Sequence, residues 1–203
     1  NQGYRNLIQL ASLAFLEGYY YKPRMDWELL EKYHHGLIAT TGCLGGHVLQ
    51  ALLQGDERGA FEKAGRLQEI FGKDNLFVEL QDHGIPEQGR TNPQLIELAR
   101  KIKAPLLVTN DSHYTDREHH AAHDALLCVQ TGESVKSTKR MRLSDQSYFL
   151  KSRDQMEATF RPFIDLPASA YDNSLRIAEM VDIDLEDKSY HLPDMPIPEG
   201  FTY

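Results

Sequence analysis

Residues 105–114 of this chain read PLLVTNDSHY. The apolar half, Pro105 to Val108, predicts a buried strand, and the polar half follows it directly. Asp111 and His113 are two positions apart, so in an extended backbone their side chains leave the same face. A carboxylate and an imidazole on one face can hold a divalent cation. A polar loop with a turn-forming Asn-Asp pair is the alternative that this stretch alone leaves open.

Two similar strand-to-loop transitions lie upstream. The apolar run 37–41 ends in a glycine-rich turn at 42–46, and the run 76–80 ends in Gln81-Asp82-His83-Gly84. Apolar residues at helical spacing predict helices around these strands, over 7–15, 26–32, 48–53, 56–71 and 92–102, and a further helix that carries Ala122, Ala125, Leu126 and Val129. For the helix over 92–102, Asn92 and Pro93 are the expected N-cap and first residue. Regular alternation of strands and helices predicts an α/β fold with a parallel sheet.

Ligand-type residues follow all three predicted strands, at the sheet edge where such folds place their sites. Cys43 lies in the glycine-rich turn, where a thiolate could bind zinc; a small buried hydrophobic side chain is the alternative. Glu79 and His83 are interpreted as hydrogen-bonding neighbours of a site rather than as metal ligands. His119 and His123 share a helix face at i, i+4 spacing, but without a zincin-type glutamate the structural interpretation is preferred.

Bulk properties narrow the function classes. The 203 residues suffice for one domain with a core, or for a domain plus a tail. A net charge of −8 argues against a free-standing DNA-binding protein with a basic face. No apolar run is long enough to cross a membrane, and two cysteines fit a reducing cytosol better than a disulfide framework. The chain also lacks a P-loop and a Gly-x-Ser-x-Gly elbow.

The pattern changes after Gly132. Residues 134–143 are polar and basic and predict a loop, and helices are expected over 154–160 and 168–181. From residue 185 the chain becomes acidic and then proline-rich, which predicts an extended linker. Three parts are therefore expected, namely a strand-and-helix part at 1–133, a helical part at 134–184 and a linker at 185–203.

Several of these stretches resemble the PHP (polymerase and histidinol phosphatase) family, in the form found in the alpha subunit of bacterial DNA polymerase III. The resemblance is carried by TTGCLGG at 40–46, ELQDHG at 79–84, NDSHY at 110–114 and HDALLCVQTG at 123–132. Further matching stretches, in the family's order, extend from GYRNL at 3–7 to LPDMPIPEG at 192–200. The family's opening His-x-His motif precedes the segment that begins here at Gly3, so the chain is expected to be the C-terminal portion of a PHP domain and its onward connection.

The resemblance implies a fold and a site. The expected fold is part of an irregular (β/α)7 barrel of parallel strands, followed by a helical segment and an extended linker. Cys43, Asp111 and His113 fall on metal-ligand positions of the family, with zinc or manganese as the expected metal. Glu79, His83 and Asn110 are expected beside these ligands. Magnesium would serve the polymerase reaction, outside this chain.

The implied function is that of a fragment of a replicative DNA polymerase, which is cytoplasmic and has no membrane association. In the intact subunit the resemblance implies DNA-directed DNA synthesis and metal-dependent phosphodiester hydrolysis of the 3′–5′ exonuclease type. DNA, dNTPs, the sliding clamp, the clamp loader and a proofreading exonuclease are the implied partners. The fragment alone is expected to be inactive, because most ligands of the site lie elsewhere. Two alternatives stay open: an inactive PHP scaffold that docks the exonuclease, and a free-standing PHP phosphoesterase.

Overall fold

A computed structural model describes residues 1–143, 145–161, 166–186, 189 and 200. Its centre is a parallel sheet of three strands in the order β1-β2-β3. The strands are β1 (Ala39–Thr40), β2 (Leu76–Leu80) and β3 (Leu106–Val108). Ala39 pairs with Leu76, and Val78 pairs with Leu106. The α/β class and the parallel pairing are confirmed, whereas closure of the sheet into a barrel stays a prediction.

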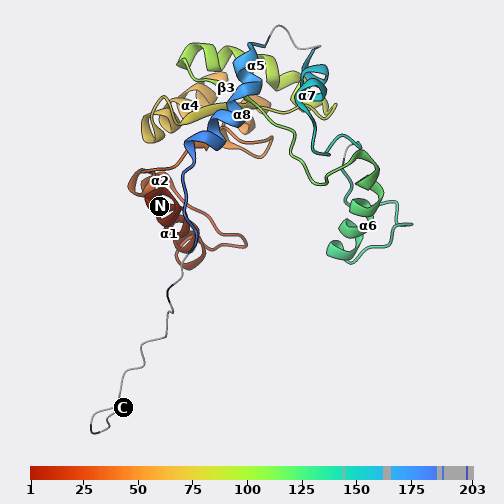
Figure 1. Cartoon of the computed structure of the whole chain (residues 1–203), viewed down its shortest axis with the longest axis horizontal. Coiled ribbons are helices and arrows are strands. Elements are labelled where there is room, and N and C mark those ends of the chain that lie inside the picture. Colours follow the sequence, from red (N-terminus) through yellow and green to blue (C-terminus); the bar gives the residue numbers. More distant parts are fainter. Residues whose placement is uncertain (144, 162–165, 187–188, 190–199, 201–203) are drawn as a thin grey trace.

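Helices connect and flank the strands. They are α1 (Gln2–Leu16), α2 (Trp27–Tyr33), α3 (His47–Leu53), α4 (Glu57–Phe71), α5 (Pro86–Ile102), α6 (His120–Thr131), α7 (Arg153–Phe160) and α8 (Ala168–Met180), with a 3-10 turn at Arg117–His119. The helices α3, α4, α5 and α8 gather around the sheet, while α6 stands apart from it (Figure 1). The predicted loop at 134–143 is confirmed in the residues described there. Most of the predicted linker at 185–203 lies outside the described residues.

The core forms between the sheet and the helices around it. Leu76, Phe77 and Val78 are completely buried in β2, because both faces of this central strand are covered. Leu95 of α5 and Phe160 of α7 complete the same buried region. On the β3 side, Asn173 of α8 donates a hydrogen bond to the Leu106 carbonyl at 2.7 Å. The packed core therefore holds the ends of the three strands in fixed positions.

The predicted start of α5 at Asn92 and Pro93 is wrong. The helix begins at Pro86, and Pro93 lies inside it without the N–H that would bond the preceding turn. Tertiary contacts hold the first turns in place. Gln88 accepts a hydrogen bond from the His83 backbone N–H at 2.8 Å, and Asn92 donates one to the Gln81 carbonyl at 3.0 Å. Asn92 therefore makes a buried contact inside the helix rather than capping its start.

The apolar stripe of α6 is not part of the core. Helix α6 forms as expected, but Leu126 is 62% exposed and Val129 is 79% exposed. The buried residues of α6 are Leu127 and Cys128. Helical spacing predicted the helix correctly, but it did not predict which face would be covered.

Candidate functional site

The polar stretch after β3 is fixed by a neighbouring segment. Asn110 is buried, and its side-chain amide donates hydrogen bonds to the carbonyls of Ser147 and Phe149, at 2.8 and 2.7 Å. Asp111 adopts a left-handed backbone conformation with φ of 47°, which Asp tolerates better than most residues. This turn ends the strand and leaves the Asp111 side chain exposed.

His113 is oriented by two backbone contacts. Its N–H donates to the Tyr148 carbonyl at 2.8 Å, and its ring Nδ1 lies 2.6 Å from the Asp111 carbonyl oxygen. A carbonyl can only accept, so Nδ1 carries the proton and a neutral ring keeps its lone pair on Nε2. Metal-binding histidines commonly have this arrangement. The exposed His113 ring therefore presents Nε2 as the nitrogen able to bind a cation.

A second imidazole lies beside His113, and it belongs to His123, which was interpreted as structural from the sequence. The His123 ring of α6 is 5.3 Å from that of His113 and 5.5 Å from that of Tyr114, between ring centroids. The i, i+4 spacing pairs His123 with His119, but His119 instead lies near Asp116. No local signal joins residues ten positions apart, because their proximity depends on where α6 is placed.

Glu79 and His83, at the end of β2, are tied into hydrogen-bond networks. Oε1 of Glu79 accepts from the Thr109 hydroxyl at 2.6 Å and from the Gln81 amide at 3.0 Å. His83 is 3% exposed, stacks on Tyr148 with ring centroids 3.9 Å apart, and lies 3.0 Å from the Ser147 hydroxyl. Burial lowers the pKa of His83 below its ordinary value, because the charged ring would lose hydration.

The turn after β1 brings Cys43 to the surface. Cys43 is exposed, so the alternative of a buried hydrophobic side chain is wrong. The glycines do allow a close backbone approach, since a Cβ on Gly46 would lie 2.4 Å from the Thr41 carbonyl oxygen. The Thr41 hydroxyl accepts the Glu79 N–H at 3.0 Å, which links the ends of β1 and β2.

These residues do not by themselves make a complete metal site. Among the described residues, no group of three or more His, Cys, Asp or Glu side chains is arranged to hold a metal ion. The assignment of Cys43, Asp111 and His113 as ligands therefore stays a prediction. Within the described part of the chain, the donor set is incomplete, and a bound metal would need further ligands.

A pocket of about 460 Å³ adjoins the buried His83, and the sequence did not point to it. Asp82, Arg117 and Lys151 are among the side chains that line it. Burial lowers the pKa of Lys151, whose ammonium donates to the Thr159 hydroxyl at 3.1 Å. The pocket combines two cations with acidic side chains, so its charge does not favour one class of ligand.

Comparison of the sequence with known proteins finds a family match and several relatives. Residues 1–83 match the PHP domain, a range that includes Cys43, Glu79 and His83. The chain is 39% identical over 202 residues to the DNA polymerase III subunit alpha of Deinococcus radiodurans. It is 40% identical over 200 residues to that of Treponema pallidum, and 40% identical over 203 residues to that of Thermus aquaticus. Each of these matches covers 98% of the chain. This chain is homologous to part of the DNA polymerase III alpha subunit.

The relationship to the alpha subunit covers a short part of the relatives. The chain spans 15 to 17% of the length of these three relatives. The PHP match ends at residue 83, so Asn110, Asp111 and His113 lie beyond it but within the homology to the alpha subunits. In the part of the chain that the structure describes, no helix is both long enough and apolar enough to cross a membrane.

Proposed function

We propose that this chain is a segment of a bacterial replicative DNA polymerase, whose intact alpha subunit carries out DNA-directed DNA synthesis. The observation that carries the proposal is homology over 98% of the chain to proteins named DNA polymerase III subunit alpha. The polymerase reaction and its magnesium belong to parts of the subunit outside this chain. DNA and dNTPs are the substrates, and the setting is the bacterial cytoplasm.

The PHP part of this subunit hydrolyses phosphodiesters in a metal-dependent reaction of the 3′–5′ exonuclease type. Cys43, Asp111 and His113 contribute ligands, with zinc or manganese as the metal, and residues outside this chain complete the site. Two observations support this assignment. The PHP match includes Cys43, and the proton on Nδ1 of His113 leaves Nε2 able to bind a cation.

The remaining partners follow from the same proposal. A replicative alpha subunit works with a sliding clamp, a clamp loader and a proofreading exonuclease. Hydrogen bonds of three neighbouring residues, Glu79, His83 and Asn110, support the ligands. Glu79 accepts a hydrogen bond from the Thr109 hydroxyl, and Asn110 fixes the turn that precedes His113.

The test of the metal site is Asp111→Asn in the intact subunit. We expect loss of zinc or manganese by elemental analysis, with DNA synthesis on a primed template retained. Asp74→Asn is the matched control, because Asp74 is also an exposed carboxylate in a loop but lies before β2. Unchanged metal content in Asp111→Asn would overturn the ligand assignment. A wild-type subunit that holds no metal at all would instead identify the PHP part as a scaffold.

The isolated 203-residue chain provides a second test. We expect no manganese-dependent release of nucleotides from a 3′-labelled DNA strand, because its described residues form no three-ligand group. Measurable exonuclease activity that disappears in His113→Ala would show that this chain holds a complete site.

A further inference from the structure

The loop that follows α6 concentrates positive charge in an acidic chain. This basic loop, residues 134–143, contains Lys136, Lys139, Arg140 and Arg142 and no acidic residue, although the chain as a whole carries a net charge of −8. The loop also contains Ser134, Ser137 and Thr138. Seven of the ten residues of the loop are exposed, all except Ser137, Arg140 and Leu143. The charge of the loop is thus opposite to that of the chain as a whole.

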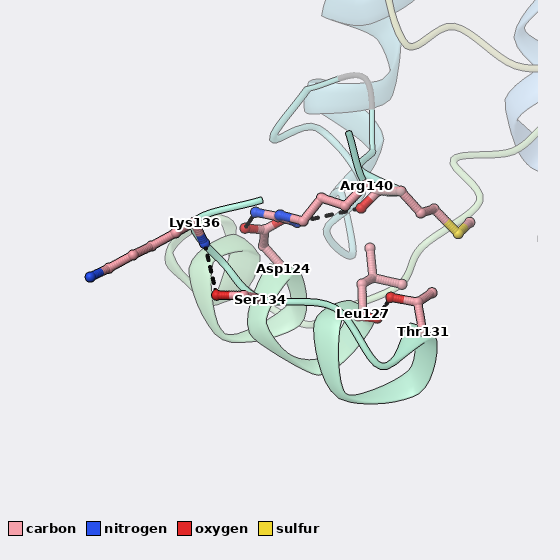
Figure 2. Close-up of polar contacts among 7 residues, drawn as sticks. Asp124, Leu127, Thr131, Ser134, Lys136 and Arg140 are labelled. Carbon is pink, nitrogen blue, oxygen red and sulfur yellow. Dashed lines mark hydrogen bonds and ion pairs between the residues drawn. The ribbon is translucent and has the colours of Figure 1, made fainter. Parts of the chain in front are cut away.

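One of the four cations holds the loop on α6. The guanidinium of Arg140 makes two hydrogen bonds to the Asp124 carboxylate, at 2.6 and 2.5 Å, and the Arg140 side chain is 1% exposed (Figure 2). The hydrogen bonds from Arg140 lower the pKa of Asp124, so the carboxylate stays charged. A paired, two-point contact of this kind fixes orientation as well as position.

The other three cations are left for an external partner. Lys136, Lys139 and Arg142 are exposed, and none of them forms an ion pair with another residue that the structure describes. Figure 2 shows the Lys136 side chain extending away from α6 while Arg140 lies back across it. The pairing of Arg140 with Asp124 therefore leaves three exposed cations that form no ion pair within the described residues, although the charge of Arg142 also helps to lower the pKa of Asp124.

We propose that the basic loop binds the phosphodiester backbone of DNA through Lys136, Lys139 and Arg142. The inference rests on the proposed function, in which the intact subunit handles DNA. Contacts to phosphates are made mainly by Lys, Arg, Ser and Thr, and these types supply seven of the ten residues of the loop. A protein-binding surface would be expected to offer a buried aromatic anchor, and the loop contains no aromatic residue.

The experiment measures DNA binding by the intact subunit as a function of salt, using fluorescence anisotropy of a labelled primed template. The test variant is Lys136→Ala, Lys139→Ala and Arg142→Ala combined. The control combines Lys73→Ala, Arg90→Ala and Lys101→Ala, which removes the same number of exposed lysines and arginines from other parts of the chain. A second variant, Lys136→Arg with Lys139→Arg, keeps the charge and shows whether the loop tolerates substitution.

Loss of three phosphate contacts is expected to reduce the slope of log affinity against log salt by about 2.1 to 2.7. The ratio of wild-type affinity to variant affinity should then fall roughly 20- to 40-fold between about 50 and 200 mM salt. The control and the charge-retaining variant should keep the wild-type slope. Equal slopes in the test variant, the control and the wild type would overturn the proposal, and would leave an acidic protein as the partner. DNA synthesis by the wild-type subunit is measured in parallel, because its absence would count against the proposed function and not against the loop.

Discussion

The sheet region (β1 to β3 with α3, α4, α5 and α8) and the α6 segment (residues 112–143) contain similar apolar helices but bury them differently. In α5, Leu95 is fully buried against the sheet, whereas Leu126 of α6 is 62% exposed. Figure 1 shows the same contrast, with α5 beside the sheet and α6 apart from it. The difference shows that an amphipathic pattern specifies a helix, while burial requires a partner surface at the right place.

The largest expected effect on stability concerns the two leucines, which differ most clearly in burial. In the 203-residue chain, Leu95→Ala is expected to lower the free energy of unfolding by about 2 to 5 kcal/mol, because it leaves a cavity in the core. Leu126→Ala, the same change on an exposed helix face, is expected to stay within about 0.5 kcal/mol of the wild type. Urea unfolding followed by circular dichroism measures both. Similar losses in the two variants would mean that α6 is as well packed as α5.

A smaller effect is expected at His83, which joins the sheet to the segment that follows α6. Burial lowers the pKa of folded His83 below 6.5, so at mildly acidic pH the unfolded chain binds more protons than the folded chain. The free energy of unfolding should therefore fall as pH drops below about 6.5, with a slope of at most about 1.4 kcal/mol per pH unit from this group. His83→Phe keeps a ring for stacking on Tyr148 and should flatten this dependence.

Unfolding of the His83→Phe variant is compared at about pH 7 and about pH 5 with that of the wild type. His35→Gln is the control, because His35 is exposed. A pH dependence in His83→Phe equal to that of the wild type would contradict the assignment of this group.

The smallest effect on global stability is expected at Asp124. Asp124→Asn removes the charge that pairs with Arg140, so the basic loop should open more often while the sheet region stays folded. Limited trypsin digestion should cleave the loop several-fold faster, and the urea midpoint of the sheet region should not change. Glu118→Gln, an exposed carboxylate before α6, is the control. Unchanged cleavage would show that the pairing does not restrain the loop.

Local sequence patterns were enough to predict most of the elements. The strand at 76–80 has the predicted bounds, and the helix predicted at 56–71 forms at Glu57–Phe71, with Asp56 accepting the Gly59 N–H at its start. The start of α5 was missed, because the bonds of Gln88 and Asn92 to the β2 end stabilise its first turns and depend on the fold. The pairing of His113 with His123 was missed for the same reason.

The sequence by itself determined the strands, the helices, the parallel α/β class and the family resemblance, because all of these are encoded in residues close together along the chain. Only the tertiary structure decided which apolar faces are covered, and that Arg140 is paired with Asp124 while its neighbouring cations are not. These properties depend on contacts between residues distant in sequence. Such contacts are set by the packing of whole elements, which no local pattern of residues specifies.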